Sequence, residues 1–330
     1  MSTTTVFAAP RLLSAALRGR ARRIHARDVW RLVGVPALAI LAFLLLWSRV
    51  SAGVETSLGQ IPGPTAVWQQ AQTLWAEHQA ERARAAAFYE RLEARNAAAL
   101  AADPGAPSIA LRYTGKPTYV DQIVTSLATV FTGFLMASLL AVPLGILCGM
   151  SATVNAAVNP FIQVFRPVSP LAWLPIVTMM VSALYVSPDP IFQKSFVNSA
   201  ITVALCSLWP TLINTTLGVS SIDRDLMNVA RVLRLTWVTT LVKVVIPASL
   251  PLMFTGLRLS LGVGWMVLIA AEMLAQNPGL GKFVWDEFQN GSSNSLGRIM
   301  VAVFTIGVIG FLLDRVMLAI HRAVDFRSQP

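Results

Sequence analysis

The feature that most constrains this chain is a stretch, residues 122–165, that contains no Asp, Glu, Lys or Arg. It is far longer than the roughly 20 apolar residues that a helix needs to cross the hydrocarbon core of a bilayer. The composition agrees, because the whole chain is 55% apolar and 13% charged, against about 25% charged residues in a typical soluble domain. We therefore predict an all-α, polytopic membrane protein.

Six apolar segments are long enough to act as transmembrane helices. The third is interrupted by Pro167, Pro170 and Pro175. Proline frees backbone groups that neighbouring helices or a water-filled cavity must satisfy. We expect spans at residues 32–50, 122–150, 168–186, 195–219, 250–275 and 296–320.

The arginines and lysines set the expected orientation, because basic flanks stay on the cytoplasmic side of a membrane. Seven arginines precede the first apolar segment: Arg11, Arg18, Arg20, Arg22, Arg23, Arg27 and Arg31. If they are inside, the loop 220–249 is inside as well, and it carries Arg224, Arg231, Arg234 and Lys243. We expect a bacterial inner-membrane protein with both termini in the cytoplasm. The first segment is interpreted as a retained anchor, with a cleaved signal peptide as the alternative.

This orientation divides the chain into five regions. Residues 1–31 form a basic cytoplasmic tail, 32–50 the first transmembrane helix, 51–121 a periplasmic segment, 122–321 the membrane core and 322–330 the cytoplasmic C-terminus. Within the periplasmic segment, residues 65–102 contain no Pro or Gly and are rich in Ala, Glu, Arg and Gln, which favours a helix. An interrupted apolar stripe indicates a helix or helical hairpin that packs on the core: Trp68, Trp75, Phe88, Leu92 and Leu100. A docking element for an external partner is the alternative.

The cytoplasmic loop contains a short amphipathic helix. One face is apolar and arginines flank it, while Pro247 and Pro251 are expected to stop the helix and turn the chain into the next span. A helix presented between two spans is suited to entering a groove on a cytoplasmic partner, although it could also only fasten the spans together. The apolar face is formed by Leu226, Val229, Ala230 and Leu233.

This loop resembles the coupling loop of binding-protein-dependent ABC importer permeases. The family pattern is Glu-Ala-Ala, three residues, Gly, nine residues, then Ile-x-Leu-Pro. Aligned on Pro247, the residues Asn228, Val229 and Ala230 occupy the Glu-Ala-Ala positions, and Arg234 stands where the family has glycine.

A second stretch is similar to the permeases for nitrate, bicarbonate, cyanate and alkylsulfonates. It reads Gly264-Trp-Met-Val-Leu-Ile-Ala-Ala-Glu272-Met-Leu-Ala, followed by Asn277-Pro-Gly-Leu-Gly-Lys-Phe. The continuation through Trp285-Asp-Glu-Phe-Gln-Asn-Gly-Ser-Ser most resembles the nitrate and nitrite branch. The resemblance covers residues 120–325.

The resemblance implies a type I ABC importer permease that moves a small anion inward, nitrate or nitrite first, with bicarbonate, cyanate or alkylsulfonate as alternatives. Its implied partners are cytosolic ATPase subunits, a periplasmic or lipid-anchored binding protein and a second copy of the chain. ATP and magnesium would be bound by the ATPase, since this chain has no phosphate-binding loop of the form Gly-x-x-x-x-Gly-Lys-Ser/Thr. The implied ATPase-coupling residues are Asp225, Asn228, Val229, Ala230, Arg231, Leu233, Arg234 and Pro247.

Polar residues within the spans are the candidates for the anion pathway. Glu272 lies near the outer end of the fifth span, where a helix-end hydrogen bond would explain it equally well. Arg258 could attract an anion, although snorkelling to the inner interface also explains it. Hydroxyls could hold an anion together with backbone N–H groups: Thr178, Ser182, Thr202 and Ser207.

Two other classes of protein fit less well. A secondary transporter would need ionisable residues at mid-membrane and usually repeated halves. An intramembrane enzyme would need paired carboxylates or a His/Cys constellation at depth, and no metal site is expected from the three histidines and two cysteines. Neither pattern is evident, so we predict a transport subunit that is not itself an enzyme.

Overall fold

The structure is a computed structural model that describes residues 30–51, 53–56, 59–103, 107–186 and 192–325. Most of the expected basic tail at 1–31 and the C-terminal residues after 325 lie outside this part. The chain divides into two compact units, one ending at Gln69 and the other beginning at Gln70.

The first unit contains the apolar helix where the first span is expected. A π-helix η1 (Trp30–Gly34) leads into α3 (Val35–Ser51). Two short strands follow, β1 (Glu55–Thr56) and β2 (Gly59–Gln60), which pair antiparallel before α4 (Pro64–Ala102) begins. With 17 residues, α3 would measure only about 26 Å at 1.5 Å per residue, slightly less than a full hydrocarbon core.

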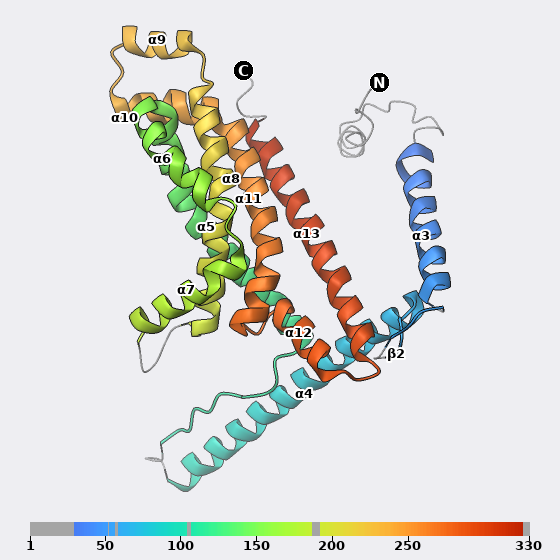
Figure 1. The fold of residues 1–330 in the computed structure, drawn as a ribbon. Helices are drawn as coiled ribbons and strands as arrows, with labels where there is room; N and C mark the ends of the chain where they lie inside the picture. The colour runs from blue at the N-terminus through green and yellow to red at the C-terminus, as the bar shows by residue number, and fades with distance from the viewer. Residues whose placement is uncertain (1–29, 52, 57–58, 104–106, 187–191, 326–330) are drawn as a thin grey trace, which may run out of the picture. The chain divides into compact units, whose positions relative to one another are not determined.

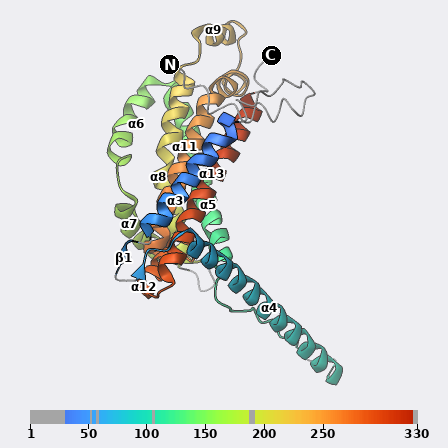
Figure 2. The ribbon, with the colours of Figure 1, turned by 90° about the vertical axis from the view of Figure 1, so that its right-hand side faces the viewer.

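Three long helices form the centre of the second unit, and a fourth packs against them (Figures 1 and 2). They are α5 (Tyr119–Met150), α8 (Lys194–Ser220), α11 (Ile246–Ala275) and α13 (Ser295–Asp325). Within the described residues, four helices are long and apolar enough to cross a membrane, and one bent pair could count as a fifth span. The spans expected at 122–150, 195–219, 250–275 and 296–320 fall on these four helices.

Small residues allow α5 and α8 to approach closely. A Cβ atom placed at Gly145 would lie 2.7 Å from Cβ of Thr215, and one at Gly149 would lie 2.5 Å from Cβ of Val219. The Thr216 hydroxyl donates to the carbonyl of Gly145 at 3.2 Å. In a bilayer, where lipid tails are as apolar as the side chains, such packing and interhelical hydrogen bonds hold helices together.

The third span differs from the expectation. Residues 151–167, expected as a cytoplasmic loop, contain helix α6 (Ala152–Phe165), and α7 (Pro170–Leu184) follows at an angle of 103°. Val158 and Ile162 of α6 pack on α5 and α8. Arg166, the C-cap of α6, still has helical dihedrals, whereas Ser169 is extended and caps a new helix that starts at Pro170. The chain therefore bends between Arg166 and Pro170 instead of spanning from 168 to 186.

Pro247 and Pro251 also act differently from the expectation that they stop a helix. Helix α10 (Trp237–Thr240) continues through the π-helical turn η2 (Leu241–Val245) into α11, so Pro247 lies in its first turn and Pro251 lies inside it. Proline lacks the N–H that an inner helical residue donates. The wider π turn just before Pro247, closed by the Ile246 N–H to the Leu241 carbonyl, relieves the crowding that a proline ring imposes.

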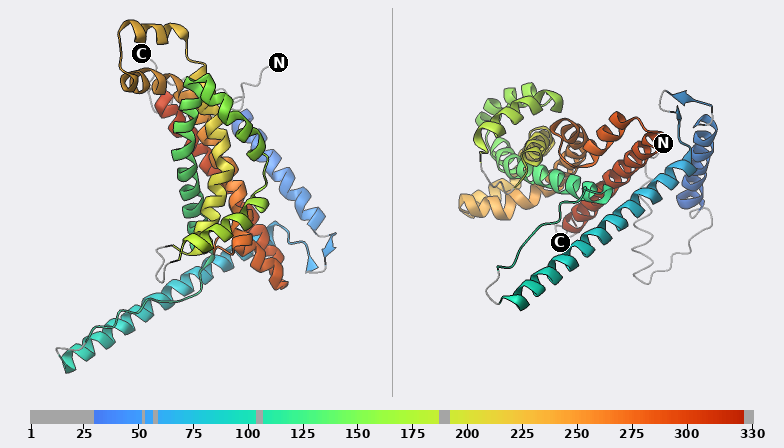
Figure 3. Two further views of the ribbon diagram at one scale, coloured as in Figure 1. Left: turned by 60° about the vertical axis from the view of Figure 1, so that its left-hand side comes forward. Right: turned by 90° about the horizontal axis from the view of Figure 1, so that it is seen from below.

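Helix α4 matches the prediction of a helix at 65–102, but its buried residues differ. Val67 and Leu74 are buried, whereas Trp68 and Trp75, expected in the stripe, are exposed. An extended segment, residues 107–118, runs back along α4 (Figure 3). The Tyr113 hydroxyl donates to Glu81 at 2.8 Å, and this hydrogen bond to a carboxylate raises the pKa of Tyr113.

Ion pairs and hydrogen bonds join α4 to the rest of the second unit. Arg82 pairs with Asp121 at the start of α5, and Glu77 pairs with Arg298 of α13. Arg298 also contacts Glu287 of α12 (Leu280–Asn290) at 3.2 Å. These ion pairs hold α4 to α5 and α13, but, contrary to the expectation, α4 does not share a packed face with the core helices.

Candidate functional site

The loop 220–249, expected on the cytoplasmic side, contains helix α9 (Arg224–Val232), which lies beyond the ends of α5, α6 and α8 (Figure 1). The Asp223 side chain caps it by accepting the N–H of Asp225 at 2.9 Å. Asp225 lies in the first turn and Arg231 in the last turn, so the charges complement the helix dipole. The helix is therefore stabilised locally, without needing contacts along its length.

The helix ends in a Schellman motif centred on Arg234. The N–H of Leu235 donates to the Ala230 carbonyl and the N–H of Arg234 to the Arg231 carbonyl, both at 3.0 Å. This motif requires a left-handed residue at its centre, and Arg234 has φ 50°. Arg234 occupies the glycine position of the coupling-loop pattern. The left-handed backbone required there explains why glycine suits that position.

Replacing Arg234 with glycine is expected to preserve the fold and to leave the melting temperature equal or slightly higher. Glycine adopts the left-handed conformation without steric cost. Arg234→Val is expected to destabilise the protein by about 1–2 kcal/mol, because a β-branched side chain is strained at positive φ. Thermal melting of the purified protein tests both variants, and equal losses in the two would contradict a role for the backbone conformation.

The coupling residues predicted from the sequence separate onto two sides of α9. Ala230 is 4% exposed and faces the protein, so it does not share a face with its apolar neighbours as expected. Val229 is 56% exposed and Leu233 63% exposed, and Leu226 and Val232 are exposed as well. The exposed apolar set, which we call the α9 face, consists of Leu226, Val229, Val232 and Leu233.

A cavity of about 730 Å³ lies between α9 and the ends of the long helices. From α9 it is lined by Arg224, Met227, Asn228 and Arg231, and from α5 and α8 by residues that include Met150 and Val219. Its lining has no carboxylate, so the arginines make it electropositive. Side chains of a partner could enter it while the α9 face contacts the surface of that partner.

Glu272 is fully buried near the C-terminal end of α11, and hydrogen bonds surround its carboxylate. The Ser126 hydroxyl of α5 lies 2.7 and 2.9 Å from the two carboxylate oxygens. The Gly281 N–H donates at 3.0 Å and the Asn277 amide at 3.4 Å. Ser126 in turn accepts the Leu280 N–H at 2.8 Å. The carboxylate therefore joins α5, α11 and α12.

Two glycines of the Asn-Pro-Gly-Leu-Gly stretch make room for this carboxylate. A Cβ atom at Gly279 would collide with the carboxylate of Glu272. A Cβ atom at Gly281 would collide with the backbone carbonyl of Ile269 and lie 2.9 Å from Cβ of Glu272. The spacing of Gly279 and Gly281 from Glu272, which resembles that of known permeases, thus has a steric cause in this fold.

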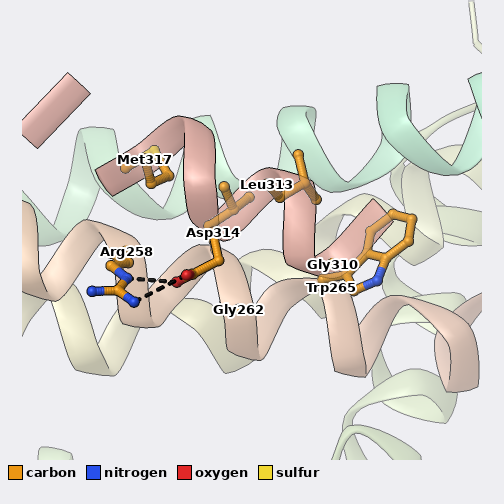
Figure 4. A pocket seen from close by; sticks show the side chains of 8 residues that line it. Arg258, Gly262, Trp265, Gly310, Leu313, Asp314 and Met317 are labelled. Carbon is orange, nitrogen blue, oxygen red and sulfur yellow. Dashed lines mark hydrogen bonds and ion pairs between the residues drawn. The ribbon is translucent and has the colours of Figure 1, made fainter. Parts of the chain in front are cut away.

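Arg258 makes an ion pair that the sequence analysis did not identify. Its Nε and one Nη donate to the two carboxylate oxygens of Asp314 on α13, at 2.5 and 3.0 Å (Figure 4). Asp314 was missed because an Asp next to Arg315 near the end of the last span resembles a solvated helix end. Only the packing of α13 along α11 brings Asp314 to Arg258.

The hydroxyl candidates lie in two different environments. Thr202 and Ser207 are fully buried in α8 and donate to carbonyls four residues earlier, at 2.8 and 2.7 Å. Thr178 is half-buried and Ser182 exposed on α7. The structure does not bring Thr178 or Ser182 together with Arg258 or Glu272 in a pocket. Among the described residues no group of His, Cys, Asp and Glu is arranged to hold a metal ion.

Comparison with known proteins gives one family and a consistent group of relatives. Residues 141–327 match the family described as binding-protein-dependent transport system inner membrane component. The bicarbonate transport system permease protein CmpB of Synechococcus elongatus is 34% identical over 289 residues, 87% of this chain and 88% of that protein. The nitrate import permease protein NrtB of the same organism is 36% identical over 204 residues, 62% of this chain and 69% of that protein.

A similar fold is found among solved structures. A chain of the MetNI methionine ABC transporter, in inward-facing conformations, superimposes with a TM-score of 0.53 and 17% identity. The match covers 62% of this chain and 95% of that chain. At this identity the likeness concerns the fold alone.

Proposed function

This chain belongs to the family of inner-membrane components of binding-protein-dependent transport systems, and from that premise we propose that it carries nitrate inward as part of a complete importer. It is an integral inner-membrane protein and a permease subunit of an ABC importer. The energy would come from ATP and magnesium bound by separate ATPase subunits. A binding protein outside would deliver the anion, and a second copy of the chain would complete the pathway.

The observation that supports coupling to an ATPase most directly is the α9 face. Val229, Val232 and Leu233 are more than half exposed although the helix is capped at both ends and locally stable. Contiguous exposed apolar side chains mark protein–protein contacts. On this proposal, nucleotide-driven closure of the ATPase pulls on α9, and the continuous helix from α10 to α11 carries the movement into the bundle.

The orientation that the proposal needs follows from charge. Helix α9 and the turn that ends it carry Arg224, Arg231 and Arg234, and short basic loops remain in the cytoplasm. This puts α9 where an ATPase can reach it, and α12 and α4 on the outside. After α9 the chain would cross the membrane once in α11 and once in α13, so the C-terminus would also lie in the cytoplasm.

The choice of nitrate rests on the amino-acid sequence of residues 276–293, which resembles the nitrate and nitrite branch. It also rests on the matches to NrtB, which are 36–38% identical to this chain, against 34% for CmpB. Bicarbonate is the second candidate, because the CmpB match extends over 87% of the chain whereas the NrtB match covers 62%. Both anions are small, planar and singly charged, so the same pathway chemistry suits either of them.

The test is ATP hydrolysis by the complete complex in proteoliposomes, with its ATPase and binding protein. Nitrate, nitrite, bicarbonate, cyanate and taurine are supplied in turn at constant ionic strength with chloride. We expect stimulation by nitrate or nitrite. If bicarbonate alone stimulates hydrolysis, bicarbonate and not nitrate is the substrate. If the chain assembles with no ATPase, the proposed importer function is overturned.

A further inference from the structure

The ion pair of Arg258 and Asp314 lies deep within two helices that are apolar enough to span the membrane. Arg258 comes 12 residues after Ile246 and 17 before Ala275, about 18 and 26 Å from the two ends of α11. Asp314 lies 19 residues after Ser295 and 11 before Asp325, about 28 and 17 Å from the ends of α13. Both groups thus lie near the middle of their helices.

The pair is only partly covered by the protein. About a third of each side chain is exposed, 35% for Arg258 and 34% for Asp314. Charged groups facing hydrocarbon at the bilayer centre are costly and usually face a bundle interior or an aqueous cavity. We conclude that this surface of α11 and α13 faces a polar space in the assembled protein, since bare lipid would leave the exposed part of both charges unsolvated.

Two cavities adjoin the pair. One of about 230 Å³ extends along Trp265, Gly310 and Met317, and one of about 650 Å³ extends along Thr255 and His321. Both are lined by Arg258, Gly262 and Asp314, and no heavy atom lies within 4 Å of the Cβ position of Gly262. A water molecule occupies about 30 Å³ in the liquid, so either cavity has room for a small anion and its remaining water.

The cluster carries one more positive than negative charge. Arg315 lies 3.7 Å from the second carboxylate oxygen of Asp314, and no further carboxylate lines either cavity. Asp314 therefore lies between two guanidinium groups. The remaining nitrogen of Arg258, Nη1, has no hydrogen-bond partner among the described residues, and Figure 4 shows it pointing away from Asp314.

We propose that Arg258 is the mid-membrane binding site for the transported anion, and that Asp314 is the counter-ion which the anion displaces. The planar guanidinium fork that now donates to the carboxylate would donate to two oxygens of a planar oxyanion instead. Asp314, released from Arg258, keeps Arg315 as its partner. No bond is made or broken and the net charge of the protein is unchanged. The proposal rests on the proposed function and adds to it a site for a small planar oxyanion.

The experiment measures anion uptake by the complete complex in proteoliposomes for the wild type, Arg258→Gln, Asp314→Asn and the neutral double variant Arg258→Gln/Asp314→Asn. Arg258→Gln is expected to lower kcat/KM about tenfold to a hundredfold, the value of a charged bidentate contact. Asp314→Asn is expected to lower KM, because the anion no longer competes with a carboxylate. Arg322→Gln, the loss of an exposed arginine elsewhere on α13, is the matched control and should equal the wild type.

The double variant separates a binding site from a structural ion pair. If Arg258 binds the anion, the double variant remains as inactive as Arg258→Gln. If the pair only fastens α11 to α13, two neutral partners restore uptake, and the proposal is overturned. A wild-type complex that hydrolyses ATP but transports no anion would instead overturn the proposed function.

A second measurement does not depend on transport activity. Nitrate added to the purified complex, against chloride at equal ionic strength, is expected to raise the melting temperature of the wild type, because a ligand that binds the folded state stabilises it. The shift should be larger for Asp314→Asn and absent for Arg258→Gln. An equal shift in all three proteins would overturn the proposal.

Discussion

Replacing Val229 with aspartate is expected to abolish ATP-driven transport while the protein still inserts into the membrane. Val229 is 56% exposed on α9 and belongs to no buried cluster, so the substitution costs little in the isolated chain. In the complex the new carboxylate would be buried in the ATPase surface. A buried charge without a partner at an interface costs about 2–5 kcal/mol, or more than tenfold in affinity.

Copurification of the ATPase with the membrane-embedded chain is the measurement, followed by substrate-stimulated ATP hydrolysis. Val229→Ile, which keeps the side chain apolar and nearly the same size, serves as the control and should bind the ATPase like the wild type. Wild-type copurification and uptake with Val229→Asp would show that the α9 face is not the docking surface.

Removing the carboxylate of Glu272 is expected to destabilise strongly the end of the bundle that contains α12. In Glu272→Ala the Ser126 hydroxyl, the Gly281 N–H and the Asn277 amide lose their common acceptor. A buried donor left unsatisfied costs about 1–3 kcal/mol, so the total is several kcal/mol. Gly279→Ala should also destabilise, because its methyl group would meet the same carboxylate.

The two substitutions are expected to be non-additive. In Glu272→Ala/Gly279→Ala the carboxylate is gone and the methyl group added at position 279 has space, so the double variant should be no less stable than Glu272→Ala. Thermal melting of the purified protein measures this coupling, which neighbouring groups show as deviations of about 0.5–3 kcal/mol. Asp286→Asn, which removes a partly exposed carboxylate of α12 that pairs with Lys282, is the control for the loss of a carboxylate at the surface. Additive losses would contradict the steric contact.

The sequence-based prediction of the fold is wrong where prolines or local turns determine where a helix begins, bends or ends. The third span was expected at 168–186, but the apolar helix begins at Ala152 and bends before Pro170. Hydropathy alone does not distinguish an uncharged loop from an apolar helix. Residues 151–167 were expected to form a loop for this reason, and they contain the apolar helix α6. Pro247 and Pro251 were expected to stop a helix, yet Pro247 follows a π turn into the first turn of α11 and Pro251 lies inside that helix.

The sequence predicts one of the candidate sites well and the others poorly. The α9 segment was identified because its signal is local, with amphipathic spacing, flanking arginines and a proline at a fixed distance. The surroundings of Glu272 and Arg258 could not be identified from the sequence. Ser126 and Glu272 are separated by 146 residues, and Arg258 and Asp314 by 56. No pattern along the chain predicts which polar groups from different helices will meet.

By itself, the amino-acid sequence determined the class of protein, the position of most helices and the segment that we propose contacts an ATPase. It could do so because bilayer thickness, the helical period and basic flanks act on consecutive residues. Only the tertiary structure decided that Ala230 faces the protein while Val229 faces outward, that Glu272 joins three helices, and that Asp314 neutralises Arg258. Those outcomes depend on how helices rotate and pack against one another, which close contacts at glycines such as Gly145 set in three dimensions.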